Sequence, residues 1–387
     1  MRRGLLVAAA LGALIAGPSG MDAALAQQAS REFAEFPPPA ARHELKVTTV
    51  AEGLDHPWGM AFLPDGRILV TERTGKLRTI QEGKLLPEPV AGLPAIEEVG
   101  QGGLLGIALH PDYARNRLIY LSYAEKDPAA DGHRTAVARF KDEGGKLTGM
   151  EVVFRGDTVR SRHHFGSRIV FGADGKMYVS IGDRGRQETA QDLNGLNGKV
   201  FRLNDDGTVP ADNPFVGKQG ARPEIFTYGN RNPQGMAMQP GIGAIWSVEH
   251  GPQGGDEINL MRAGVNYGWP VITYGRTYGL GLAIGEGTAK PGMEQPRAHF
   301  VPSLAVAGMT FYDGAVLPNW KGDMVIALLG GGLVRADIEG DRVVAMERVL
   351  EEELGRTRDV AVGPDGALYA LIDDSAPAGK LVRIERK

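Results

Sequence analysis

The chain has 387 residues, 42% of them hydrophobic and 23% charged, a composition typical of a protein that folds around a core and not of a disordered chain. Its 43 basic and 47 acidic residues give a formal net charge of −4, which argues against broad neutralisation of phosphates, so we expect no nucleic-acid partner. The absence of cysteine excludes disulfide frameworks, zinc–thiolate sites and thiol catalysis.

The first 26 residues have the features of an export signal. Arg2 and Arg3 precede an apolar run over residues 4–16, and the small residues at 24–26 predict cleavage after Ala26. This run is shorter than the ~20 residues of a membrane-spanning helix, which makes a membrane anchor the less favoured alternative. We therefore expect a periplasmic or secreted protein without a membrane span, exported by the general or the twin-arginine route.

Beyond the predicted signal we expect an N-terminal extension over residues 27–45 and a folded domain over residues 46–387. The extension contains a proline-rich stretch at residues 36–39. The folded domain shows a repeat in which a short apolar run, a turn and a second apolar run follow one another. Six copies are recognisable, with clear ones at residues 58–72, 106–121, 168–180 and 359–371 and weaker ones beginning at Gly235 and Gly308.

The turn of the repeat has a physical explanation. In Pro64-Asp65-Gly66 the proline presets its φ angle, the aspartate bonds back to the backbone, and the glycine adopts the positive φ that reverses the chain. The flanking runs lack a helical period and read as strands, so each copy is a hairpin.

Six similar hairpins predict an all-β fold, a six-bladed β-propeller with four-stranded antiparallel blades. Radial stacking buries both faces of every hairpin and removes the open edges of the sheets. The spacing of about 60 residues per copy exceeds the ~40 to 45 of compact blades, so we expect long loops at one mouth of the central channel. A two-domain β-sandwich is the alternative. One helical turn is expected at residues 347–354.

Two polar clusters precede repeat copies and are candidates for chemistry. His163 and His164 stand before the third copy, and Asp183 stands after its second strand. A histidine held by a carboxylate is a poised general base, although the pattern does not choose between the two histidines and a surface histidine beside a turn aspartate remains possible. Before the fourth copy, Arg231 offers a rigid fork for carboxylates or a developing oxyanion, or else it ties down its own loop.

Residues 249–259 (EHGPQGGDEIN) form a third cluster. Asp256, Glu257 and the backbone carbonyls of the glycines are hard oxygen donors of the kind that Ca²⁺ prefers. The spacing does not match an EF-hand, and a glycine-rich turn without metal is the alternative.

At these positions the sequence resembles the soluble dehydrogenases for glucose and sorbosone that depend on pyrroloquinoline quinone (PQQ), and especially the bacterial periplasmic aldose sugar dehydrogenases. The resemblance covers residues 54–359, nearly the whole expected mature chain. Its most specific strings are GNRNPQG at 229–235, GP at 251–252 with DEIN at 256–259, and NYGWP at 266–270.

The resemblance implies a role for individual residues. His164 matches the catalytic base, Asp183 the carboxylate that orients it, and Arg231 a residue near the reactive quinone carbonyl. The implied PQQ contacts are Gln101, Arg231, Asn232, Arg356 and Arg358. The carbonyls of Gly251 and Pro252 match ligands of the Ca²⁺ that joins protein and PQQ, while Glu257 and the Tyr267 carbonyl resemble a second, structural Ca²⁺ site.

The implied reaction is oxidation of the anomeric hydroxyl of an aldose to a lactone, with the electrons passed to an external acceptor. Two departures concern cofactor affinity and sugar preference: residues 328–333 (LLGGGL) lack a lysine that the glucose dehydrogenases carry, and His163 replaces their aspartate. A Ca²⁺-dependent lactonase or another hydrolase on a six-bladed propeller, or a non-catalytic binding propeller, is the alternative.

Overall fold

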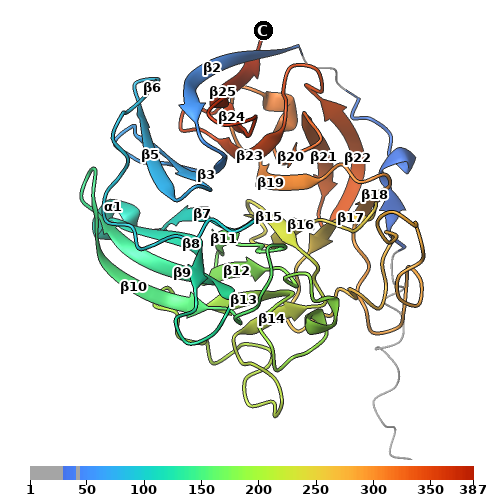
Figure 1. The fold of residues 1–387 in the computed structure, drawn as a ribbon. Coiled ribbons are helices and arrows are strands. Elements are labelled where there is room, and N and C mark those ends of the chain that lie inside the picture. The colour runs from blue at the N-terminus through green and yellow to red at the C-terminus, as the bar shows by residue number, and fades with distance from the viewer. Residues whose placement is uncertain (1–28, 41–43) are drawn as a thin grey trace, which may run out of the picture.

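The computed structural model describes residues 29–40 and 44–387, so the predicted export signal and its cleavage site lie outside the described residues. Figure 1 shows six sheets arranged as blades around one axis, which confirms the predicted all-β propeller. Five blades have four strands, and one sheet has an added fifth strand. In every blade the four main strands run antiparallel from the innermost to the outermost position.

The first three blades follow the chain directly. Blade one contains β3 (Pro57–Phe62), β4 (Ile68–Glu72), β5 (Lys76–Gln81) and β6 (Lys84–Leu85). Blade two contains β7 (Leu104–Leu109), β8 (Leu118–Lys126), β9 (His133–Asp142) and β10 (Leu147–Arg155). Blade three contains β11 (Ile169–Phe171), β12 (Met177–Ile181), β13 (Lys199–Leu203) and β14 (Ile225–Tyr228).

Among the last three blades, blades four and six each include a strand from the N-terminal part of the chain. Blade four contains β15 (Pro233–Met238), β16 (Ile245–Glu249), β17 (Asp256–Leu260) and β18 (Ala298–Phe300), with β1 (Arg31–Glu32) added in parallel. Blade five contains β19 (Val306–Phe311), β20 (Met324–Leu328), β21 (Leu333–Glu339) and β22 (Arg342–Val349). Blade six contains β23 (Thr357–Val362), β24 (Leu368–Ile372), β25 (Gly379–Arg386) and β2 (Leu45–Leu54).

Pairing of β2 with β25 closes the ring. The two strands run antiparallel from Leu45 opposite Arg386 to Leu54 opposite Gly379, so the N-terminal strand completes the blade that the C-terminus builds. The innermost strands then contact one another in sequence around the axis, and β23 of the last blade contacts β3 of the first. In the described part of the chain, the innermost strand of every blade therefore lies between the innermost strands of its two neighbours.

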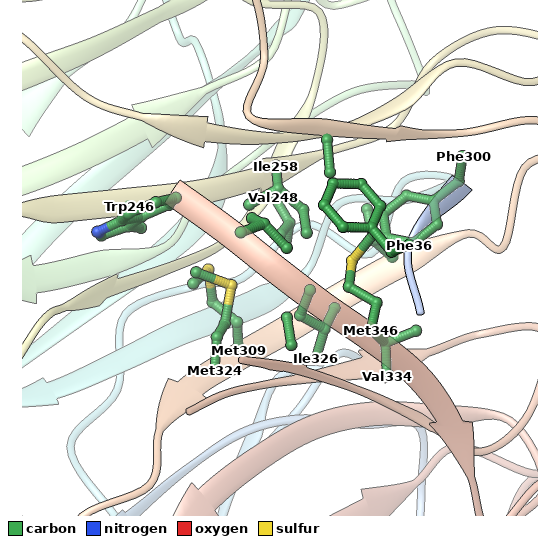
Figure 2. Close-up of a cluster of buried hydrophobic side chains, with 14 of the residues drawn as sticks. Phe36, Trp246, Val248, Ile258, Phe300, Met309, Met324, Ile326, Val334 and Met346 are labelled. Carbon is green, nitrogen blue, oxygen red and sulfur yellow. The ribbon is translucent and has the colours of Figure 1, made fainter. Parts of the chain in front are cut away.

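The hydrophobic core consists of separate clusters between neighbouring blades. Each of the six blade interfaces holds one such cluster. A single hairpin would leave an apolar face exposed to solvent, and packing against the neighbouring blade covers it. Figure 2 shows the cluster between blades four and five, where Trp246 and Val248 face Met309 and Met324. Phe36, which follows the short 3₁₀ helix η1 (Phe33–Glu35), also packs there, so the N-terminal segment contributes to the core.

The turns have the chemistry that the repeat predicts. Asp65 accepts a hydrogen bond from the Arg67 amide at 3.2 Å, and Gly66 has a φ of 88°. The turn at Asp174 and Gly175 is built in the same way.

Helical structure is scarce, and one helical prediction is wrong. Residues 347–349 complete β22, and the following residues form a turn because the strand pairing with β21 extends to Val349. The other helical segments in the described residues are α1 (Tyr113–Asn116), η2 (Gln187–Ala190) and η3 (Pro318–Trp320). Among the described residues, no helix is long and apolar enough to cross a membrane.

Candidate active site

The loop between β10 and β11 carries the two histidines, and His164 is the one that contacts Asp183. Its Nδ1 lies 2.6 Å from Oδ1 of Asp183, which follows β12. The His164 side chain is 15% exposed, whereas His163 is an exposed residue. Burial lowers the pKa of His164, the hydrogen bond from Asp183 opposes this, and the positive charge of Arg231 lowers the pKa further. The His164 imidazole is therefore neutral at neutral pH and can accept a proton.

Trp269 holds the Asp183 carboxylate from its other side. The indole Nε1–H of Trp269 donates to Oδ2 of Asp183 at 2.7 Å, and the Gly185 amide donates to Oδ1 at 2.7 Å. With both oxygens bonded, the carboxylate presents a fixed acceptor to the imidazole. The sequence indicates Trp269 only as part of a motif, because no local pattern predicts a contact across 86 residues.

The backbone of the histidine loop is strained and is held by two neighbouring side chains. His164 has a φ of 52°, which is uncommon for a residue with a Cβ atom. Its amide donates to Oε1 of Gln101 at 2.8 Å, so Gln101 positions the loop. The buried Arg184 donates to the carbonyls of His163 and Ser161, each at 3.0 Å, and its guanidinium stacks over Phe165.

Arg231 lies between the base and the glycine-rich loop. Its Nη1 donates to the carbonyl oxygens of His250 at 3.0 Å and of Gly251 at 2.7 Å, and its guanidinium carbon is 5.3 Å from the centre of the Trp269 ring. Its Nε is buried and has no partner among the described residues. Trp269 thus contacts both Asp183 and Arg231.

A cavity of about 410 Å³ opens beside these residues. Asn232 and Gln234 line one part of it, and Oδ1 of Asn232 accepts hydrogen bonds from the Gly166 amide and from Gln234. Arg356 and Arg358 line another part. The remaining lining residues are His56, Trp58, Arg73, Gly100, Gln101, Leu105, Phe165, Gly166, His250, Leu329, Asp373, Asp374 and Ser375.

The two arginines from blade six that line this cavity differ in their exposure and in their hydrogen-bond partners. Arg356 is half-exposed and donates to Asp373 at 3.2 Å. Arg358 is buried, and its Nη1 donates to Oε1 of Gln234 at 3.2 Å while its Nε has no partner among the described residues. Burial lowers the pKa of Arg358 to about 10, so this side chain is still charged at neutral pH. The structure thus brings Gln101, Asn232, Arg356 and Arg358 to one cavity.

A much smaller cavity of about 10 Å³, the space that one water molecule requires, lies behind Arg231. Glu249, Glu257, Gly251 and Tyr267 line it. Asp256 does not, because its Oδ1 accepts from the Gly251 amide and its Oδ2 from Ser303 and the Ala305 amide. Sequence reasoning treated Asp256 as a possible ion ligand, but in the structure it fixes the loop. Pro252 is buried in this loop next to Gly251.

Glu249 is buried and lies opposite the partly buried Glu257 on the neighbouring strand; the sequence indicated Glu257 as an ion ligand but not this pairing. Burial raises the pKa of Glu249, and burial together with the charge of Glu249 raises the pKa of Glu257 to about 8. Glu249 accepts hydrogen bonds from Asn230, from Asn259 and from the amides of Arg231 and Asn232, whereas Glu257 accepts one from Asn259. Within residues 29–40 and 44–387, no group of three or more His, Asp or Glu side chains could hold a metal ion.

The sequence profile of the Glucose / Sorbosone dehydrogenase family matches residues 54–383. The chain belongs to this family. The chain is also 43% identical over 350 residues to aldose sugar dehydrogenase YliI of Escherichia coli, with 89% of this chain and 94% of that protein covered. The family match and this similarity confirm the prediction from the sequence that the protein is an enzyme.

Solved structures of family members have the same fold. The apo form of the soluble aldose sugar dehydrogenase of E. coli superimposes with a TM-score of 0.84 at 42% identity, over 89% of this chain and 100% of that one. The PQQ-bound form of an aldose sugar dehydrogenase of Streptomyces coelicolor superimposes with a TM-score of 0.74 at 30% identity, over 90% and 100% of the chains.

The contacts of His164 predict how its ring titrates. In an NMR titration of the protein without cofactor, we expect His164 to lose its proton below the usual histidine range, because burial disfavours the imidazolium. Asp183→Asn should move this titration to still lower pH, since the carboxylate stabilises the charged ring. His164→Gln identifies the signal. A His164 signal that titrates above the usual range, or that Asp183→Asn moves upwards, would contradict this account.

Proposed function

We propose that this enzyme oxidises the anomeric hydroxyl of aldose sugars to lactones by hydride transfer to bound PQQ, with electrons passed on to an external acceptor. One observation carries the proposal: a neutral histidine held by a buried carboxylate stands beside a cavity walled by arginines. Family membership and the PQQ-bound structure of a relative support a role of this arrangement in PQQ-dependent oxidation.

The residues around the larger cavity suit PQQ, a planar tricarboxylate. Arg358 lines this cavity and Arg231 lines the smaller one, and each buries an Nε–H that has no partner among the described residues, which is costly unless an acceptor joins it. Arg356 and Arg358 would bind carboxylates, with Asn232 and Gln101 as polar contacts. When bound, PQQ supplies the electron-accepting quinone.

The chain's own catalytic work is proton transfer and charge stabilisation. Nδ1 of His164 is committed to Asp183, so Nε2 would take the proton of the sugar hydroxyl. Asp183 would hold the tautomer and stabilise the imidazolium that forms, as Trp269 fixes its orientation. The guanidinium of Arg231 would stabilise the negative charge that the cofactor gains with the hydride.

Ca²⁺ suits the smaller cavity. Burial raises the pKa of Glu249, and burial together with the charge of Glu249 raises the pKa of Glu257, so a divalent ion beside these carboxylates would relieve the repulsion. Glu257 and the Tyr267 carbonyl would be ligands of a structural ion. The Gly251 and Pro252 carbonyls would be ligands of a second ion, bound together with PQQ.

The remaining parts of the proposal concern the surroundings of the reaction. The partners would be a small aldose and an external electron acceptor. The export signal predicted at residues 1–26 supports a periplasmic or secreted location, with residues 27–45 as an extension and 46–387 as the catalytic propeller.

Reconstitution tests the proposal directly. Wild-type protein loaded with PQQ and Ca²⁺ should reduce an artificial dye when aldoses are added. His164→Ala should lower kcat by about 10²- to 10⁴-fold while PQQ still binds, because a general base acts in the transition state. His163→Ala is the matched control and should cost far less. Failure with every aldose, PQQ-independent lactone hydrolysis, or exchanged behaviour of the two variants would contradict the proposal.

Calcium removal should destabilise the PQQ-free protein. A bound ion stabilises by RT ln(1 + [L]/Kd), about 2.7 kcal/mol at a hundredfold excess over Kd, so EDTA should lower the melting temperature of wild type. The gain from Ca²⁺ should be larger at about pH 8.5 than at about pH 5.5, because protonation of Glu257 is favourable below its raised pKa of about 8 and competes with the ion. Glu257→Gln should respond little to Ca²⁺. A melting curve of wild type that EDTA leaves unchanged would remove the structural ion.

A further inference from the structure

A second histidine–carboxylate pair stands at the point where the ring closes. His56 lies between β2 of blade six and β3 of blade one, and its Nδ1 is 3.0 Å from Oδ1 of Asp373, which follows β24. Like His164, His56 has a positive φ, in this case 50°. Both residues of this pair line the larger cavity, and neither has a role in the catalysis proposed above.

Asp373 links this histidine to the arginine wall. Its Oδ2 lies 3.2 Å from Nε of Arg356 and 3.5 Å from Nη2 of Arg358, while its Oδ1 faces His56. The carboxylate is 8% exposed, and three basic side chains contact it. Because Nδ1 of His56 is occupied by Asp373, its Nε2, which has no protein partner in the described residues, remains for a ligand of the cavity.

The acidic side chains in and around the cavity offset the charge of its arginines, so a further cation would strengthen binding of an anion. Arg73, Arg356 and Arg358 line the cavity together with Asp373 and Asp374, and Arg73 also pairs with Glu98 at 3.1 Å, so three acidic side chains offset the three positive charges. The wall also contains the apolar Leu329, which contributes no charge. A charged His56, 32% exposed and oriented by Asp373, would add a positive donor on the arginine side of the cavity.

We propose that His56 is a further cofactor-binding residue, which in its charged form donates its Nε2–H to an anionic oxygen of the cofactor while Asp373 orients the ring. The inference rests on the function proposed above, because it takes the ligand of this cavity to be PQQ. It predicts that a substitution which removes the imidazole weakens cofactor binding, because the cavity loses both a positive charge and a donor.

The other histidines of the site do not compete for this effect. Burial lowers the pKa of His164 below its usual value and that of His250 to about 4, so the charged form of both rings is disfavoured. The charged groups around His56 are Asp373 and Asp374 after β24, Arg356 and Arg358 around the start of β23, and Arg73 after β4, whose amide donates to the His56 carbonyl.

The test compares wild type, His56→Asn and the control His110→Asn. Asparagine tolerates positive φ, so His56→Asn keeps the backbone while it removes the charge. His110 also faces a carboxylate, with Nε2 at 3.5 Å from Asp205, but it does not line the cavity. Each protein is titrated with PQQ in excess Ca²⁺ at about pH 5.5 and about pH 8, and binding is followed by quenching of tryptophan fluorescence.

At about pH 5.5, His56→Asn should bind PQQ about tenfold more weakly than wild type, the size expected for a hydrogen bond to a charged group. An unchanged melting temperature of His56→Asn would show that the variant is folded. His110→Asn should match wild type at both pH values.

Equal affinities of His56→Asn and wild type at both pH values would overturn the inference. It would also fail if His56→Asn raised the KM for the sugar while PQQ affinity stayed unchanged, because His56 would then contact the substrate. Failure of the proposed function looks different: wild type itself would not bind PQQ at either pH.

Discussion

Pairing of β2 with β25 is the constraint on which the rest of the structure depends. Ten residues from near the N-terminus complete the last blade, and this closes a ring whose six interfaces each bury an apolar cluster. Because the ring is closed, the segments that precede the innermost strands converge near a common axis. Those segments carry His56, His164, Arg231 and Arg356.

The catalytic arrangement follows from this convergence. The base and its carboxylate come from blade three, the arginines from blades four and six, and Trp269 from the segment after β17. Trp269 touches both Asp183 and Arg231, so orientation of the base is tied to the position of the guanidinium. The positive φ of His164 and the burial of Glu249 and Glu257 each cost stability, and such costs are typical of functional sites.

The fold could be predicted from the sequence because its information is local and repeated. Pro64-Asp65-Gly66 specifies a turn by itself, and six similar hairpins leave few ways to cover their faces. The prediction at residues 347–354 failed because pairing with β21 outweighs the local helical preference of a short glutamate-rich segment.

The site could be predicted only in part. The residues alone suggested His163 or His164 with Asp183, and the family resemblance was needed to prefer His164 and to select the arginines. The positions of Trp269, Glu249 and Asp373 depend on contacts between segments far apart in the chain. One signal was available: Asp183 and Asp373 both directly follow the second strand of a repeat, so the repeat itself marks both carboxylates.

The central claim is that His164 and the arginine-walled cavity form one sugar-oxidising site. It is tested most directly by mixing PQQ-loaded protein with an aldose in a stopped-flow instrument, without oxygen or acceptor. We expect one equivalent of the oxidised quinone absorbance to disappear in a single turnover, and to persist in His164→Ala with PQQ still bound. Persistence of this absorbance in wild type, or its loss at the same rate in His164→Ala, would contradict the account.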